Sequence, residues 1–136
     1  MRNYSNVRWS GGADCFQDFA DSDGIIQDCG SFLVDYFYTG KPCCYMLKSP
    51  KDITEKFAPL GQDCLKHCTL AYDEKAIVDF IDNTIIDGND PLAEERRRFA
   101  RERIMLNYPH ASDIALDAIK QEIGIPISMP CLPFLT

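Results

Sequence analysis

Long apolar runs are absent from this 136-residue sequence, and so are internal repeats and low-complexity segments. No stretch approaches the ~20 apolar residues that a membrane-spanning helix needs. The start shows no charged segment followed by an apolar one, so we expect no secretory leader. Basic residues are outnumbered, with 14 Lys and Arg against 21 Asp and Glu and a net charge of −7. That balance disfavours a nucleic-acid-binding protein, which usually presents a basic face.

Histidine is also scarce, since the chain contains only His67 and His110. His67 lies within residues 64–68, which read CLKHC. A zinc site needs three or four ligands, and no second ligand pair follows elsewhere, so we expect no metal site. The cysteines are odd in number, which without a leader indicates a reducing compartment and free thiols that pack as small hydrophobes. They are Cys15, Cys29, Cys43, Cys44, Cys64, Cys68 and Cys131.

The patterns that are present alternate between strand and helix. The length suits one domain with a substantial core. Apolar periodicity and turn residues predict strands at 6–9, 25–28, 43–47 and 69–72. They predict helices at 13–20, 31–39, 61–67, 73–86, 91–103 and 113–123, with residues 48–60 as a loop and 125–136 as an extended or disordered tail. This order is typical of an α/β fold in which helices cover a parallel sheet.

One segment combines a short apolar strand, a polar turn and a helix. Residues 22–31 read SDGIIQDCGS, and the helix that follows ends at Gly40. The first N–H groups of a helix lack partners and carry the positive end of its dipole, so such a turn suits an anion. Ligands of open α/β sheets bind beyond the carboxyl ends of the strands. The sequence therefore predicts a phosphate-binding turn at residues 28–32.

Residues 22–42 resemble the donor-binding turn of the CDP-glycerol glycerophosphotransferases, which build teichoic-acid and capsule polymers. More loosely, they resemble the second domain of glycosyltransferases of the GT-B fold. The family turn usually reads Asp-Tyr-Ser-Ser, and this chain has Asp28-Cys29-Gly30-Ser31. Gly30 removes one hydroxyl but lets the backbone approach a phosphate closely. Further segments similar to the family's C-terminal third follow in the same order, at 57–61, 71–72, 77–86 and 108–112.

The resemblance implies a Rossmann-like domain at residues 1–124, corresponding to the C-terminal half of a GT-B enzyme. Such enzymes move glycerol phosphate or a sugar from a nucleotide-activated donor to a cell-surface polymer. They work at the cytoplasmic face of the membrane, and we expect neither a metal nor another cofactor. The family's proposed catalytic base is a histidine upstream of the donor turn, whereas both histidines here lie downstream of it. We therefore expect Met1 to begin inside the second domain and the chain alone to be inactive.

The same resemblance implies contacts to the donor phosphates or nucleotide, but no catalytic residue. These contacts would come from Asp28, Cys29, Gly30, Ser31, Phe32, Lys41, His110 and Ser112. Plain structural roles remain open beside them. Asp28 could form an Asx-turn, Ser31 could cap its helix and Lys41 could be a surface lysine. His110 and Ser112 could simply begin the last helix.

A second interpretation is a non-catalytic flavodoxin-like or receiver-like module that binds a protein partner. Receiver domains need clustered acids at strand ends, and Asp28 has no convincing acidic partner at the first predicted strand. The arginines between Arg96 and Arg103 alternate with glutamates, which predicts a solvated helix face rather than a polyanion site. Apolar residues in 125–136 indicate a further possibility, a homodimer formed through the tail.

Overall fold

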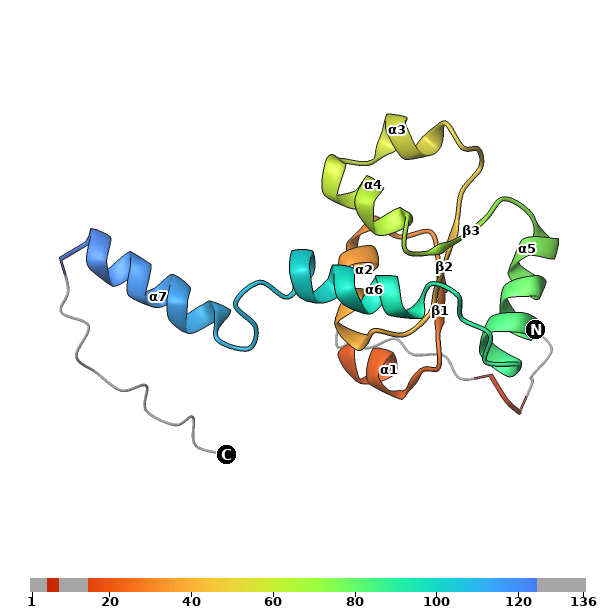
Figure 1. Ribbon diagram of the computed structural model, residues 1–136, viewed down its shortest axis with the longest axis horizontal. Helices are drawn as coiled ribbons and strands as arrows, with labels where there is room; N and C mark the ends of the chain where they lie inside the picture. The colour runs from red at the N-terminus through yellow and green to blue at the C-terminus, as the bar shows by residue number, and fades with distance from the viewer. Residues whose placement is uncertain (1–4, 8–14, 125–136) are drawn as a thin grey trace.

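A three-stranded parallel sheet forms the centre of the chain. The computed structural model describes residues 5–7 and 15–124 of the 136. The strands are β1 (Ile25–Gln27), β2 (Cys43–Met46) and β3 (Thr69–Ala71), in the order β1-β2-β3 (Figure 1). Ile26 lies opposite Cys44, and Cys44 lies opposite Thr69. This sheet confirms the predicted α/β class and places the apolar strand β2 at its middle, where both faces are covered.

Helices follow each strand, as a parallel sheet requires. Before β1 comes α1 (Phe16–Asp21), and between β1 and β2 come α2 (Gly30–Asp35) and the 3-10 helix η1 (Tyr36–Thr39). Between β2 and β3 come α3 (Asp52–Lys56) and α4 (Pro59–Leu65). The remaining elements are α5 (Glu74–Asp79), the π-helix η2 (Phe80–Ile86), α6 (Ala93–Phe99), the π-helix η3 (Ala100–Ile104) and α7 (Ala111–Glu122).

The two faces of the sheet are unequally covered. On one face, Cys43 and Tyr45 pack into a large buried cluster with Leu33, Phe37 and Phe99. On the other face, a small cluster forms around Cys44, Ala71 and Phe80, with Ile77 and Ile85 packed against it. Alternation along β2 explains the division, since successive strand residues point to opposite faces. The larger core therefore lies between the sheet and α2, α4 and α6.

The prediction of a loop at residues 48–60 is wrong, because α3 lies inside it and α4 begins at Pro59. The α3 helix has only one residue, Ile53, packed against the main core, and it is held largely by polar contacts of Asp52. The Asp52 carboxylate accepts from the backbone N–H groups of Lys48 and Ser49 at 3.1 and 3.2 Å. Hydrophobic periodicity cannot reveal a helix of this kind.

Other predicted boundaries also change. Residues 6 and 7 form no strand, and the rest of the strand predicted at 6–9 lies outside the described residues, as do residues 13–14 and the tail 125–136. Ser112 does not cap the last helix, since α7 begins at Ala111 with His110 as its N-cap. The next helix after η2 begins at Ala93 rather than Pro91. Gly40, at φ 67°, does end η1 as predicted.

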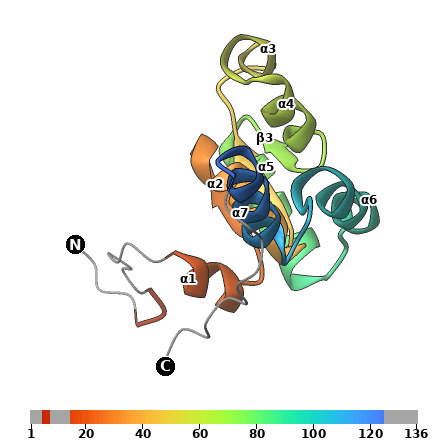
Figure 2. The same ribbon diagram turned by 90° about the vertical axis from the view of Figure 1, so that its left-hand side faces the viewer.

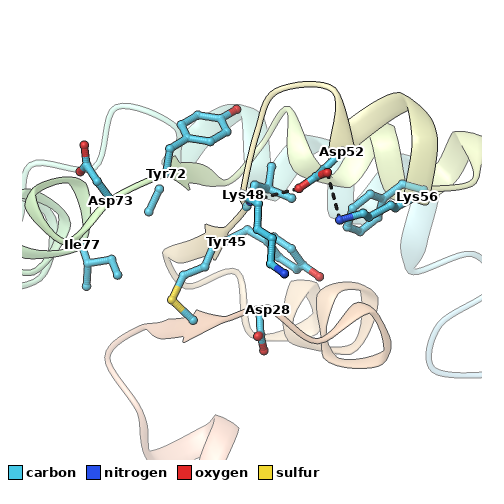
Figure 3. Close-up of a pocket in the computed structure, with 12 residues that line it drawn as sticks. Asp28, Tyr45, Lys48, Asp52, Lys56, Tyr72, Asp73 and Ile77 are labelled. Atoms are coloured by element: carbon cyan, nitrogen blue, oxygen red, sulfur yellow. Dashed lines mark hydrogen bonds and ion pairs between the residues drawn. The ribbon is translucent and has the colours of Figure 1, made fainter.

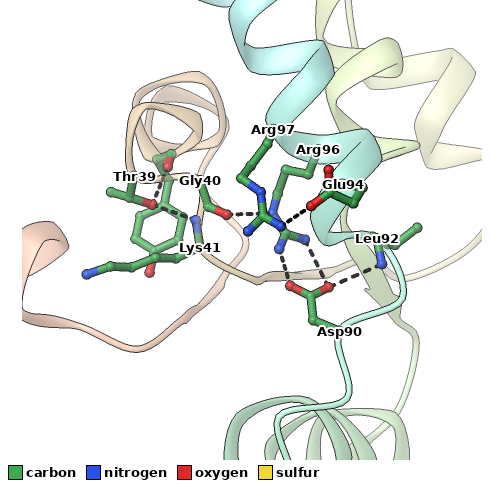
Figure 4. Close-up of polar contacts among 9 residues, drawn as sticks. Thr39, Gly40, Lys41, Asp90, Leu92, Glu94, Arg96 and Arg97 are labelled. Atoms are coloured by element: carbon green, nitrogen blue, oxygen red, sulfur yellow. Dashed lines mark hydrogen bonds and ion pairs between the residues drawn. The ribbon is translucent and has the colours of Figure 1, made fainter.

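Arg96 is buried, which contradicts the prediction that the arginines of this helix are solvated. Its side chain is 2% exposed, and its guanidinium pairs with Asp90, as Figure 4 shows. Its Nε donates to the Gly40 carbonyl at 3.3 Å. The composition of a charged run does not show which one of its residues is buried. Arg97 and Arg98 do remain at the surface.

Close packing fixes the entry to β1. A Cβ added to Gly24 would lie 2.5 Å from Cδ1 of Ile85 and 3.2 Å from the Pro42 carbonyl oxygen. Ile85 belongs to η2, so Gly24 brings the chain before β1 against the π-helix.

Within residues 5–7 and 15–124, no helix combines the length and apolarity needed to cross a bilayer.

Candidate functional site

A cavity of about 390 Å³, here called the strand-end pocket, opens at the carboxyl edge of the sheet. Asp28 reaches it directly after β1, Lys48 shortly after β2, and Tyr72 directly after β3 (Figure 3). Asp52 and Lys56 of α3 form another wall. The pocket therefore occupies the edge at which ligands of open α/β sheets bind.

Tyr45 supplies a hydroxyl to this pocket from a side chain that is only 2% exposed. Its ring packs edge-on against Phe57, with centroids 5.5 Å apart. No hydrogen bond joins its hydroxyl to another residue in the described part of the chain. Burial, followed by the charge of Asp28, raises the pKa of Tyr45, so the hydroxyl remains a donor at neutral pH. The hydroxyl is not among the buried polar atoms that lack a partner, which in the described residues are Gln27 Oε1 and His67 Nδ1. It therefore opens into the pocket, where a ligand can reach it.

Asp52 holds in place the two parts of the pocket wall that carry lysines, the 48–49 turn and Lys56. One carboxylate oxygen holds the backbone N–H groups of the 48–49 turn, and the other lies 2.9 Å from the Lys56 Nζ. The Lys56 ammonium and then these N–H groups lower the pKa of Asp52, which stays ionised. Lys48 bonds Asp52 only through its backbone, and its side chain extends between Tyr45 and Asp28 (Figure 3). Its ammonium is thus placed where it can meet an anion.

Apolar surface forms much of the remaining wall. Met46, Ala71 and Ile77 line the pocket, and Tyr72 stands at its rim with 42% of its surface exposed. Asp73 also lines it, but its carboxylate accepts from Ala76 N at 2.8 Å and caps α5. A ligand with an anionic part and a flat or apolar part would match both sides. No histidine lines the pocket, and its groups suit binding more than acid–base chemistry.

Only the first residue of the predicted phosphate-binding turn reaches the pocket. Asp28 lines it, whereas Cys29, Gly30, Ser31 and Phe32 do not. Cys29 is the N-cap of α2, and its Sγ lies 3.1 Å from the Ser31 hydroxyl. That hydroxyl, followed by the backbone N–H groups of Ser31 and Phe32, lowers the pKa of the Cys29 thiol. The turn therefore lies beside the pocket, and the N–H groups of Ser31 and Phe32 face Cys29.

The structure does not bring the other predicted contacts to this edge. Lys41 lies before β2, at the opposite edge of the sheet. Its Nζ donates to the carbonyls of Ala20 and Ser22, each at 2.6 Å. His110 and Ser112 lie at the start of α7, which extends away from the sheet (Figure 1).

Sequence reasoning missed most of the groups that line the pocket. Tyr45 was assigned to a buried strand, and nothing in the sequence shows that its hydroxyl opens into a cavity. The sequence does not predict that Lys56 lines the pocket, because it does not predict the α3 helix that carries Lys56. Lys48 and Tyr72 could have been found, since both lie just past the carboxyl ends of predicted strands and such ends meet at one edge.

Cys64, Leu65 and Cys68, which lie beside His67 in the sequence, belong to the buried core. The His67 ring stacks on Phe99, with centroids 4.4 Å apart. In residues 5–7 and 15–124, no three His, Cys, Asp or Glu side chains are placed to share a metal ion.

Comparison of the chain with family models, curated proteins and solved structures found no match.

Proposed function

We propose that this chain is a donor-binding domain that holds a nucleotide-activated donor in the strand-end pocket. The observation that carries the proposal is Tyr45, a side chain only 2% exposed whose hydroxyl opens into the pocket that Lys48 and Asp28 also line. A phosphate could accept from Tyr45 and from the two lysines, and Asp28 could accept from a sugar or glycerol hydroxyl. The apolar wall near Tyr72 suits the base.

The resemblance of residues 22–42 to the CDP-glycerol glycerophosphotransferases supports a specific form of this proposal. The donor would be CDP-glycerol or a related CDP-alcohol, and the acceptor a cell-surface polymer at the cytoplasmic face of the membrane. As the bond to the nucleotide breaks, negative charge builds on the leaving phosphate. Lys48 and Lys56 would stabilise that charge more strongly than the charge of the intact donor.

The general base of such a transfer would come from outside the strand-end pocket, because none of the lining residues is a histidine. A base on another domain or chain would activate the acceptor hydroxyl. The chain by itself would then bind donor without transferring it. A GT-B arrangement, in which the donor lies between two Rossmann-like domains, is the architecture proposed for the complete enzyme.

Thermal unfolding with and without millimolar nucleotide tests the proposal. A ligand present at ~100 times its dissociation constant adds ~2.7 kcal/mol of stability. We expect CDP and CDP-glycerol to raise Tm, and UDP and GDP to raise it less. A larger rise with UDP or GDP would assign the site to a sugar donor instead. No rise with any nucleotide would contradict the proposal.

Two lysine variants locate the site. Lys48→Ala should weaken CDP binding by about tenfold, the loss of one charge-assisted hydrogen bond. Lys51→Ala, in the same turn but outside the pocket lining, is the matched control and should leave binding unchanged. Tyr45→Phe should also weaken binding while keeping the ring contact with Phe57. If Lys48→Ala and Tyr45→Phe both bind CDP normally, the ligand lies elsewhere.

A further inference from the structure

The last helix has no partner in the part of the chain that the structure describes. None of the residues of α7 is buried. Its large apolar side chains are exposed, with Leu116 at 40% and Ile119 at 57%, and Ile123 at its end is 62% exposed. Figure 1 shows α7 extending away from the sheet and its covering helices, and in Figure 2, seen from that side, α7 lies in front of them. A helix of 12 residues is only marginally stable in water without packing contacts. We therefore expect the exposed apolar surface of α7 to pack against another surface.

The exposed apolar side chains form one continuous strip, here called the α7 strip. At about 100° per residue, Ala115, Leu116, Ile119 and Ile123 fall within an arc of roughly 100°. Asp113 and Lys120 both lie along the same edge of that arc. Ile114 is also exposed, at 49%, but it lies on the far side of the helix. The α7 strip is therefore bordered on one edge by an acid near its start and a base near its end.

We propose that the α7 strip is covered by the α7 strip of a second copy of this chain, in an antiparallel pair. Setting Leu116 opposite Ile119 of the second copy produces the same contact twice, as two-fold symmetry requires. The same alignment brings Lys120 against Asp113 of the second copy, again twice. Within one chain Lys120 Nζ lies 3.9 Å from Asp117 and Asp113 lies 3.7 Å from His110 Nδ1, so the pair across the interface would add to or replace these two contacts. Charge complementarity thus selects this register. A parallel pair would align both helix dipoles and form neither ion pair.

Small side chains favour the pairing. Ala115 borders the strip and lets the two helices approach closely. The pair is short, so its buried area falls below the ~1,200 Å² of a standard interface. We expect a dissociation constant on the order of 100 μM, at the weak end of protein association. This inference is independent of the proposed function, because no residue of α7 lines the strand-end pocket.

Sedimentation velocity of the full chain over a concentration series tests the proposal. The wild type should pass from monomer to dimer as concentration rises. Leu116→Asp should remain monomeric throughout, because it places a charge in the strip. Ile114→Asp is the matched control and should dimerise like the wild type. Circular dichroism should show that both variants keep their helix content.

Charge reversal tests the antiparallel register. Asp113→Lys alone and Lys120→Glu alone should each remain monomeric, since each places like charges opposite one another. An equimolar mixture should form a dimer, because the two variants are complementary to each other. A wild type that stays monomeric would overturn the proposal. A mixture that stays monomeric, or a loss of dimer in Ile114→Asp, would also overturn it.

Discussion

Arg96 and Asp90 form an ion pair that joins α6 to the turn preceding it, and the Arg96 side chain is only 2% exposed. Two guanidinium nitrogens meet the two carboxylate oxygens of Asp90. Because Nε also donates to the Gly40 carbonyl, the pair ties α6 to the end of η1. The buried arginine thus connects the second half of the chain to the first.

Loss of this arginine should destabilise the whole fold. Arg96→Ala leaves Asp90 without its partner, and breaking a buried pair in this way costs about 3 kcal/mol. Arg98→Ala is the control, because Arg98 and Glu95 are both more than half exposed and such pairs contribute less than about 1 kcal/mol. Urea unfolding measures both changes. Equal losses in the two variants would show that burial of Arg96 adds nothing.

The Cys29 thiol should ionise below the pH of an ordinary cysteine. The Ser31 hydroxyl, then the N–H groups of Ser31 and Phe32, lower its pKa by stabilising the thiolate. Alkylation of Cys29, followed by peptide mass spectrometry, should therefore show a lower midpoint in the folded chain than in urea. Ser31→Ala should raise that midpoint. Cys44 and Cys64, whose pKa values burial raises to about 11, should react later than Cys29. Identical midpoints for Cys29 in the folded and unfolded states would refute this prediction.

Asp52 should make the turn at the pocket sensitive to acid. Lys56, then the turn N–H groups, hold its pKa below the unfolded value of about 3.9. Its contribution to stability is therefore present above pH ~4 and lost as the pH falls through the lower, folded pKa. Asp52→Asn should show a shallower decline of Tm on acidification than the wild type. Lys56→Gln should show an intermediate decline, and parallel curves for all three proteins would contradict this assignment.

A methyl group at Gly24 should destabilise the fold, because it meets Ile85 and the Pro42 carbonyl. The added methyl of Gly24→Ala would meet Ile85 Cδ1 and crowd the Pro42 carbonyl, which costs about 1 kcal/mol or more. Ile85→Val removes the Cδ1 atom, so the double variant should recover part of that loss in a double-mutant cycle. Gly30→Ala is the control, since nothing lies within 4 Å of its added methyl. Additive losses would show that the two positions do not interact.

Strong local signals explain what the sequence predicted. Ile25 and Cys43 to Met46 carry apolar strand patterns, and Gly40 and Asp73 mark helix ends by chemistry that acts over a few residues. The α3 helix and the buried Arg96 depend instead on partners that no periodicity reveals. The edge of the sheet that forms the site was predictable from the parallel order. The pocket walls were not, because Tyr45 and Lys56 reach it through tertiary packing.

The π-helix η2 makes the length of its segment critical. Its wider turn holds a residue that an α-helix would not need, and this sets the direction in which Ile85 points. Deleting one residue there while the wider helix form is kept would turn every later side chain about the helix axis. Ile85 would leave Gly24, and the chain would reach Asp90 one residue short. Insertions and deletions should therefore be absorbed in the loop around Gly88, while η2 keeps a fixed number of residues.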